Sequence, residues 1–167
     1  IRVGDNIACV RTLSGGFGCA GTSEALGVTT QPPTKYAFPS ASPAAADPGW
    51  GGYSWTDVQE VATGDSFACA RRTGGAVYCL GADDAAQNIF GGAPTQTPLQ
   101  AQDAPAGAET LSCYHRACCA SVGRDVTCWG LAGEWNGGAR FKNTVTLPAD
   151  IHAIAVGRPF ACATLTP

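Results

Sequence analysis

A short cysteine-bearing segment recurs four times along this chain of 167 residues. The four copies read Gly4-Asp-Asn-Ile-Ala-Cys9, Gly64-Asp-Ser-Phe-Ala-Cys69, Tyr114-His-Arg-Ala-Cys-Cys119 and Gly157-Arg-Pro-Phe-Ala-Cys162. Three copies continue to a second cysteine after a short turn, at Cys19, Cys79 and Cys128. Repeated units bury their apolar faces on one another, so this repeat constrains the architecture more strongly than any single residue does.

Each complete repeat is predicted to form a β-hairpin. In the second repeat, the apolar start Val58-Gln-Glu-Val61 leads to Cys69, Gly74-Gly75 supplies a turn, and Val77-Tyr-Cys79 returns as the partner strand. Facing residues of an antiparallel pair lie about 4.5–5.5 Å apart, which falls within the usual range for a disulfide. The predicted disulfides are Cys9–Cys19, Cys69–Cys79 and Cys119–Cys128.

Three of the nine cysteines remain after these pairings. Cys113 and Cys118 occur only in the third repeat, and we pair them with each other. Cys162 occupies the first-cysteine position of the fourth segment, so its partner is expected at the spacing of the other repeats. Because the sequence stops at Pro167, we expect Cys162 to be unpaired here or bonded to another chain.

The composition excludes several classes of function. A net charge of −3 with only ten lysines and arginines gives no basic surface for nucleic acid. No segment approaches the roughly 20 apolar residues that span a bilayer, so no membrane insertion is expected. Nine cysteines, if they are paired, indicate an oxidising compartment, and we therefore expect a secreted or extracellular protein. The start at Ile1, with no signal-like segment, predicts a processed product or a fragment.

The chain is predicted to be a single repeat domain over residues 1–167. The repeat cores are expected near 1–27, 58–90, 110–138 and 151–167. Two Pro-rich stretches, 31–49 and 91–107, are expected to be inter-repeat loops. Their Ser-Pro, Ala-Pro and Thr-Pro dipeptides are typical of segments that carry O-linked sugars, and O-glycosylation of these loops is a hypothesis.

The repeated phrase Gly-x-x-Phe-Ala-Cys-Ala, followed by a glycine turn and then by Val-Tyr-Cys79-Leu-Gly or Val-Thr-Cys128-Trp-Gly, resembles a known repeat. It is similar to the regulator-of-chromosome-condensation type, in the cysteine-bearing form of bacterial secreted proteins and of Crinkly-type plant receptor kinases. The resemblance covers most of the chain outside the Pro-rich loops. It implies a β-propeller of four-stranded blades, commonly seven.

The chain departs from that pattern in two respects. The tail after the second cysteine usually begins with tryptophan, and only Trp129 in the third repeat keeps it. Three complete repeats and one opening strand are also too few for a closed ring, since propellers have roughly four to eight blades. The predicted fold class is therefore all-β, with propeller blades built from disulfide-stapled antiparallel hairpins. These blades form a partial propeller or, as we favour, a fragment of a longer chain.

Two chemical alternatives come from the third repeat. Cys113, His115, Cys118 and Cys119 lie within seven residues, and all are types that bind zinc. The paired Cys-x-x-Cys spacing is missing, however, so disulfides are favoured and no metal is predicted. A catalytic thiol activated by His115 would need one reduced cysteine of low pKa beside the imidazole, which nothing in the sequence indicates.

Function is expected to reside in a surface. The prediction is a non-enzymatic extracellular structural or protein-interaction scaffold, with no catalytic residue and no cofactor. Its partner is expected to be another protein or further copies completing the propeller, with Trp135, Trp50 and Tyr53 as candidate contacts, because aromatic residues favour interfaces. The alternatives are a secreted inhibitor or ligand-binding ectodomain and, third, an enzyme with a thiol or zinc site. The guanine-nucleotide exchange of the family's nuclear founder is not expected of a chain so rich in cysteine.

Overall fold

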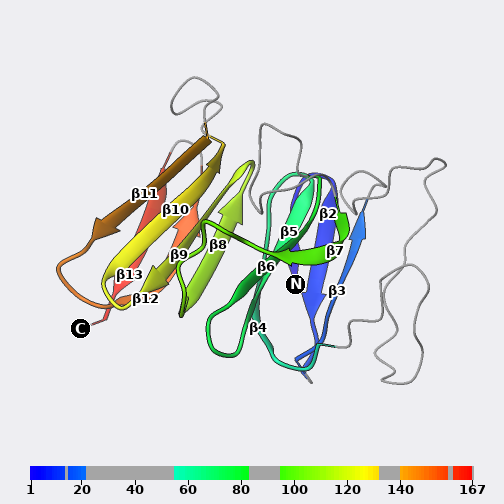
Figure 1. Ribbon diagram of the computed structural model, residues 1–167, viewed down its shortest axis with the longest axis horizontal. Coiled ribbons are helices and arrows are strands. Elements are labelled where there is room, and N and C mark those ends of the chain that lie inside the picture. The colour runs from blue at the N-terminus through cyan, green and yellow to red at the C-terminus, as the bar shows by residue number, and fades with distance from the viewer. Residues whose placement is uncertain (14, 22–54, 83–94, 132–139, 158–159, 167) are drawn as a thin grey trace.

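The computed structural model describes residues 1–13, 15–21, 55–82, 95–131, 140–157 and 160–166, and every regular element within them is a β-strand. Figure 1 shows antiparallel sheets stacked side by side, from the N-terminal sheet at one end to the C-terminal sheet at the other. In the part of the chain that the structure describes, no helix is long and apolar enough to cross a membrane.

The sheets are numbered here as blades 1 to 4. Blade 1 contains β1 (Arg2–Val3), β2 (Ile7–Arg11) and β3 (Phe17–Gly21). Blade 2 contains β4 (Val58–Thr63), β5 (Phe67–Arg72), β6 (Val77–Gly81) and β7 (Thr95–Gln100). Blade 3 contains β8 (Thr110–Tyr114), β9 (Ala117–Val122), β10 (Asp125–Leu131) and β11 (Arg140–Thr146). Blade 4 contains β12 (Ile151–Val156) and β13 (Ala161–Leu165).

Disulfides join facing residues of the central hairpin in each of the first three blades. The pairs are Cys9–Cys19, Cys69–Cys79 and Cys119–Cys128, with Cα–Cα distances of 4.0–4.1 Å. A fourth disulfide, Cys113–Cys118, joins β8 to β9. Cys162 is exposed and carries a free thiol. The predicted all-β fold of disulfide-stapled hairpins is confirmed.

The outer strands differ from the prediction. Residues 91–107 are predicted as a loop, but the described part of this range contains β7, which pairs with β6. Pro98 has no N–H to donate, yet it is tolerated because β7 forms the outer edge of its sheet. The register of β6 against β7 also shifts between Cys79 and Gly81. Strand β11 likewise lies between two predicted cores. The predicted loop 31–49 lies outside the described residues.

Two apolar layers lie between successive blades. The layer between blades 1 and 2 consists of buried residues from both, namely Ile7, Cys9, Cys19, Val58, Val61, Ala68 and Ala70. The layer between blades 2 and 3 includes Phe67, Cys69, Val77, Cys79, Leu111, Cys118, Ala120 and Trp129. The first and second hairpin disulfides therefore each face the next blade. Apolar burial of this kind is the main favourable term in folding.

One backbone hydrogen bond recurs between blades at the hairpin turns. The turn residue Gly15 accepts the N–H of Val58 at 2.9 Å, and Gly75 accepts the N–H of Ala108 at 3.1 Å. At the third junction Gly123 accepts the N–H of Ile151, also at 3.1 Å. All three glycines have positive φ, between 55° and 82°, a conformation that other residues adopt only rarely. The glycines of the predicted turns therefore also anchor each following blade.

The opposite ends of the blades are joined through the tight turns before the first cysteine. Asn6 donates its backbone N–H to the carbonyl of Asp65 at 2.9 Å, and Asp65 donates to the carbonyl of His115 at 3.0 Å. Gly64 lies in this stack, where an added Cβ would fall 2.5 Å from the His115 carbonyl oxygen and closer still to the Phe67 ring. A glycine begins this turn because the Phe67 ring and the neighbouring turn at His115 leave no room for a side chain.

We expect Gly64→Ala to lower the free energy of unfolding by about 1–3 kcal/mol, because the methyl group would overpack the turn stack. Gly157 holds the equivalent position in blade 4, where the nearest atoms to an added Cβ lie 3.5 Å away. Gly157→Ala is thus the matched control and should change stability little. Urea unfolding followed by circular dichroism measures both. Equal effects of the two substitutions would contradict the proposed role of the stacked turn.

Candidate interaction site

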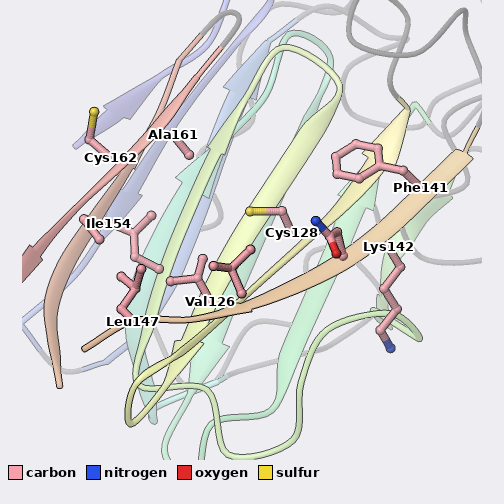
Figure 2. Close-up of a pocket in the computed structure, with 11 residues that line it drawn as sticks. Val126, Cys128, Phe141, Lys142, Leu147, Ile154, Ala161 and Cys162 are labelled. Carbon is pink, nitrogen blue, oxygen red and sulfur yellow. The ribbon is translucent and has the colours of Figure 1, made fainter. Parts of the chain in front are cut away.

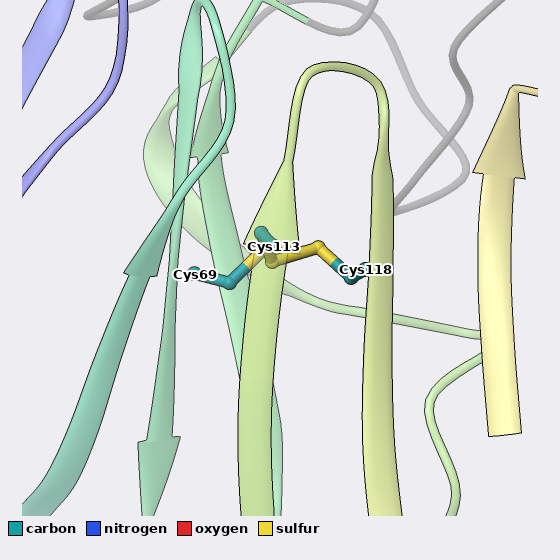
Figure 3. Close-up of side chains that lie close together, drawn as sticks. All are labelled: Cys69, Cys113 and Cys118. Atoms are coloured by element: carbon teal, nitrogen blue, oxygen red, sulfur yellow. Dashed lines mark hydrogen bonds between the residues drawn. A yellow bond between two sulfur atoms is a disulfide. The ribbon is translucent and has the colours of Figure 1, made fainter. Parts of the chain in front are cut away.

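Three sulfur atoms meet between blades 2 and 3. The Sγ atoms of Cys69, Cys113 and Cys118 lie within 4.8 Å of one another, and Figure 3 shows the Cys113–Cys118 disulfide beside Cys69. The Cys69 and Cys118 sulfurs are 3.9 Å apart. Because each sulfur is already in a disulfide, this is a packing contact with no hydrogen to share. In this oxidised form the cluster offers no thiolate to a metal.

The sequence offers His115, with Cys113, Cys118 and Cys119, as possible zinc ligands. In the structure the imidazole Nδ1 of His115 contacts the Oδ2 atom of Asp65, and Cys119 is bonded to Cys128. His115 itself has a φ of 51° in the β8–β9 turn. The Cys113–Cys118 disulfide also removes the thiol that nucleophilic catalysis beside His115 would require. The geometry supports a structural role for this segment.

An aromatic cluster lies at the junction of blades 1 and 2. The Trp55 ring stacks on Phe17 with centroids 5.9 Å apart and meets Tyr78 edge-on at 5.2 Å. The Arg72 guanidinium lies 5.0 Å from the Trp55 centroid and 5.5 Å from that of Tyr78. Asp57 accepts from Arg72 Nε at 2.8 Å, and this bond raises the pKa of Arg72 above its usual value. Trp55 therefore joins the two blades, and its cation site is filled from within the chain.

A large apolar groove lies between blades 3 and 4. Figure 2 shows its two sides, with Ala161 and Cys162 on β13 and with Val126 and Phe141 on the strands of blade 3. Its volume is about 660 Å³. The other lining residues are Cys128, Lys142, Asn143, Val145, Leu147, Ile154 and Ala163. Exposed large apolar residues occur at both ends of the stack, and those at this end include Phe160 at 60% and Val145 at 51%.

Blade 4 is the last blade of the described stack. Its two strands pair with each other, and among the described residues β13 has no partner on its other edge. An unpaired strand edge presents a row of backbone donors and acceptors to any strand that can align with it. The groove, this edge and the free thiol of Cys162 form one continuous surface, which is here called the terminal site.

Sequence reasoning placed partner contacts elsewhere. Trp50, Tyr53 and Trp135 all lie outside the described residues, so these three contacts stay predictions. The groove was missed because the residues on its two sides come from separate repeats and carry no shared motif. Only the unmatched Cys162 signalled that the fourth repeat differs from the others.

Comparisons with known proteins agree with this architecture. No protein-family model matches the sequence, and no curated protein matches it. Among solved structures, human WBSCR16 gives a TM-score of 0.65 at 15% identity, covering 97% of this chain and 43% of that chain. Prp20p from Saccharomyces cerevisiae, described with its binding to Gsp1p and histones, gives 0.62 at 12% identity, with 96% and 42% covered. The structure of Kap60 bound to yeast RCC1 (Prp20) gives 0.59 at 15% identity, with 95% and 40% covered.

These similarities establish the fold. The described residues form β-propeller blades of the kind found in RCC1 and WBSCR16. The chain spans less than half the length of each of these matched chains. It therefore has the fold of part of an RCC1-like propeller.

Trp129, on β10, tests how much one inter-blade side chain contributes. It is fully buried, and its indole Nε1 has no hydrogen-bond acceptor among the described residues. Trp129→Ala should lower the free energy of unfolding by about 3–5 kcal/mol by leaving a large cavity. Trp129→Phe should be clearly milder, because it also removes a buried unpaired donor. Urea unfolding followed by far-ultraviolet circular dichroism measures both. Equal losses would contradict the prediction.

Proposed function

We propose that this chain is a non-enzymatic, extracellular propeller module that acts as a structural or protein-interaction scaffold. The observation that carries the proposal is the set of four disulfides, which account for eight of the nine cysteines. Disulfides persist in oxidising compartments and are rare in the cytosol. They support the secreted location and the cysteine-bearing, Crinkly-type form of the repeat.

The buried positions of these disulfides support a role in rigidity. Cys19, Cys69, Cys79 and Cys118 have no measurable exposure, and Cys9 and Cys119 have almost none. Each hairpin disulfide should contribute somewhat less than the roughly 3 kcal/mol expected for a closed loop of about 15 residues, mainly by restricting the unfolded chain. Blades fixed in this way hold their connecting loops and their exposed end in one arrangement, which suits a binding surface.

The described residues favour binding over catalysis. The side chains that could act as base or ligand at the blade ends, His115 and Asp65, contact each other, and the nearby cysteines are oxidised. What Prp20p binds, namely Gsp1p and histones, belongs to that protein. For this chain we propose a protein partner that docks on the terminal site or on the loops. O-linked sugars on the Pro-rich loops remain part of the proposal.

Thiol counting on the natively produced protein tests this function. We expect one reactive thiol per chain, from Cys162, no bound zinc, and no thiol at all in Cys162→Ala, with an unchanged melting temperature. Cys69→Ala should release Cys79, lower the melting temperature and make a second thiol available to alkylation as the blade loosens. Mass spectrometry before and after reduction and alkylation counts the thiols.

Two results would overturn the proposal. Alkylation of most cysteines without prior reduction would remove the disulfide framework and the argument for an oxidising compartment. Zinc bound at one equivalent per chain would support instead the metal-site alternative at Cys113, His115 and Cys118. In the first case Cys69→Ala would have little effect on the melting temperature.

A further inference from the structure

Two disulfides lie in contact across the layer between blades 2 and 3. Cys69–Cys79 staples the central hairpin of blade 2, and Cys113–Cys118 joins β8 to β9 of blade 3. The Cys69 and Cys118 sulfurs are 3.9 Å apart, and Figure 3 shows them with Cys113. Among the described residues, Cys69, Cys113 and Cys118 form the only group of three cysteine sulfurs within 4.8 Å of one another. The scaffold function gives no reason for this contact between two disulfides.

The four cysteines differ in their access to solvent. Cys69, Cys79 and Cys118 are fully buried, whereas Cys113 is half-buried. Cys113 also lines a pocket of about 270 Å³ between the inner strands of the blades, which Arg2 lines as well. Thiol–disulfide exchange requires that the attacking thiolate reach a sulfur atom. A dissolved thiol therefore meets Cys113 first, and it reaches the other three sulfurs only through reaction there.

We propose that these four cysteines form an exchange site for a small thiol, which reacts at Cys113 and transfers a disulfide across the blade interface. The small thiolate attacks the Cys113 sulfur, so a mixed disulfide forms there and the Cys113–Cys118 bond breaks. The released Cys118 thiolate attacks the Cys69 sulfur, which forms a Cys69–Cys118 disulfide and breaks Cys69–Cys79. The Cys79 thiolate that leaves takes up the proton lost by the small thiol.

The exchange balances without an oxidant or a reductant, because two disulfides are present before it and two after it. Its product has a small thiol bonded to Cys113, a free thiol at Cys79, and blade 2 covalently joined to blade 3. The inference goes beyond the proposed scaffold function, since it assigns a covalent modification to Cys113.

Two features of the structure favour the transfer. Cys118 is fully buried, so a thiolate left there would be an unpaired buried charge, and the neighbouring Cys69 sulfur gives it a bond to form. The new disulfide would also join residues 49 apart in sequence, whereas the existing ones join residues 10 and 5 apart. A disulfide that closes a longer loop restricts the unfolded chain more, so the transferred disulfide stabilises the stack more.

Reduced glutathione is the probe, added to the natively produced protein at neutral pH. The reaction is stopped with acid, free thiols are alkylated, and the protein is digested with trypsin without reduction. Trypsin cuts after Arg72 and after Arg116, which isolates the segment 73–116. This segment contains both Cys79 and Cys113. Mass spectrometry of the disulfide-linked fragments then reports which bonds are present.

In the untreated protein, the segment 73–116 should be linked to the two segments that carry Cys69 and Cys118. After treatment we expect this segment to be released, with glutathione on Cys113 and an alkylated Cys79. The segments that carry Cys69 and Cys118 should at the same time become linked to each other.

A double variant, Cys113→Ala with Cys118→Ala, removes the disulfide at which the small thiol enters. Glutathione should then open Cys69–Cys79 at least about tenfold more slowly than in the unchanged protein, because both sulfurs of this disulfide are fully buried. Equal rates of opening would show that glutathione reaches Cys69–Cys79 directly, and would overturn the inference.

The variant Cys79→Ala tests the transfer without any small thiol. It leaves the Cys69 thiol beside the Cys113–Cys118 disulfide. The Cys69 thiolate should attack the Cys118 sulfur, so that the isolated variant has a Cys69–Cys118 disulfide and a thiol on Cys113. If this variant does not fold, the glutathione result on the unchanged protein decides.

Cys19→Ala is the matched control in the first hairpin. It frees Cys9, which does not belong to the group of three sulfurs, so its thiol should stay on Cys9. A glutathione adduct on Cys113 with Cys69–Cys79 still intact would overturn the inference. A Cys79→Ala protein whose thiol stays on Cys69 would do the same.

The map of the untreated protein separates this inference from the scaffold proposal. If that map contains the four disulfides of the structure, failure of the transfer rejects the exchange site alone. If these cysteines are reduced in the untreated protein, the scaffold and the exchange site are rejected together.

Discussion

The cross-strand disulfide of each hairpin is the constraint on which the rest of the structure depends. It joins two facing residues of the central strands and, in blades 1 and 2, lies in the apolar layer that receives the next blade. Because a disulfide needs facing cysteines within a narrow distance, it fixes the register of the hairpin. A slip of one residue would turn every buried side chain of the strand to the wrong face. The same bond therefore sets the register and contributes to the core.

The apolar layers between blades hold the blades together, in a chain with few charged residues. The layer between blades 1 and 2 consists of small and medium side chains, with Ala68 and Ala70 of blade 2 set against Ile7 and the cysteines of blade 1. Close approach of the sheets then brings the turns together, so glycine is needed where the chain meets another backbone, as at Gly64. Backbone hydrogen bonds at both ends of the blades satisfy groups that this approach would otherwise bury unpaired.

The central hairpins could be predicted from the repeat, whereas the outer strands and the contacts between blades could not, for physical reasons. The central hairpins follow from the recurrence of Cys69 and Cys79 with a glycine turn between them, because both ends of the hairpin are marked. The outer strands β7 and β11 carry no such marks. Among the described residues, each of these outer strands pairs with one strand only and leaves its other edge open. Polar residues such as Lys142 on β11 are exposed, so the sequences of these strands resemble loops. The contact between Cys69 and Cys118 joins separate repeats, and a search for motifs along the chain cannot detect it.

In stacked repeats each unit contacts only its neighbours, so the surfaces that no neighbour covers are the ones open to a partner. An inner blade such as blade 2 has both faces buried, so its chemistry is confined to turns and outer edges. Blade 4 contacts blade 3 through β12, its strand β13 is largely exposed, and its cysteine is unpaired while the equivalent cysteines are bonded. The apolar groove lies beside β13, whereas the layer between blades 2 and 3 contains the buried Trp129 from the third strand of blade 3. The free thiol of Cys162 and the apolar groove thus lie together at this blade.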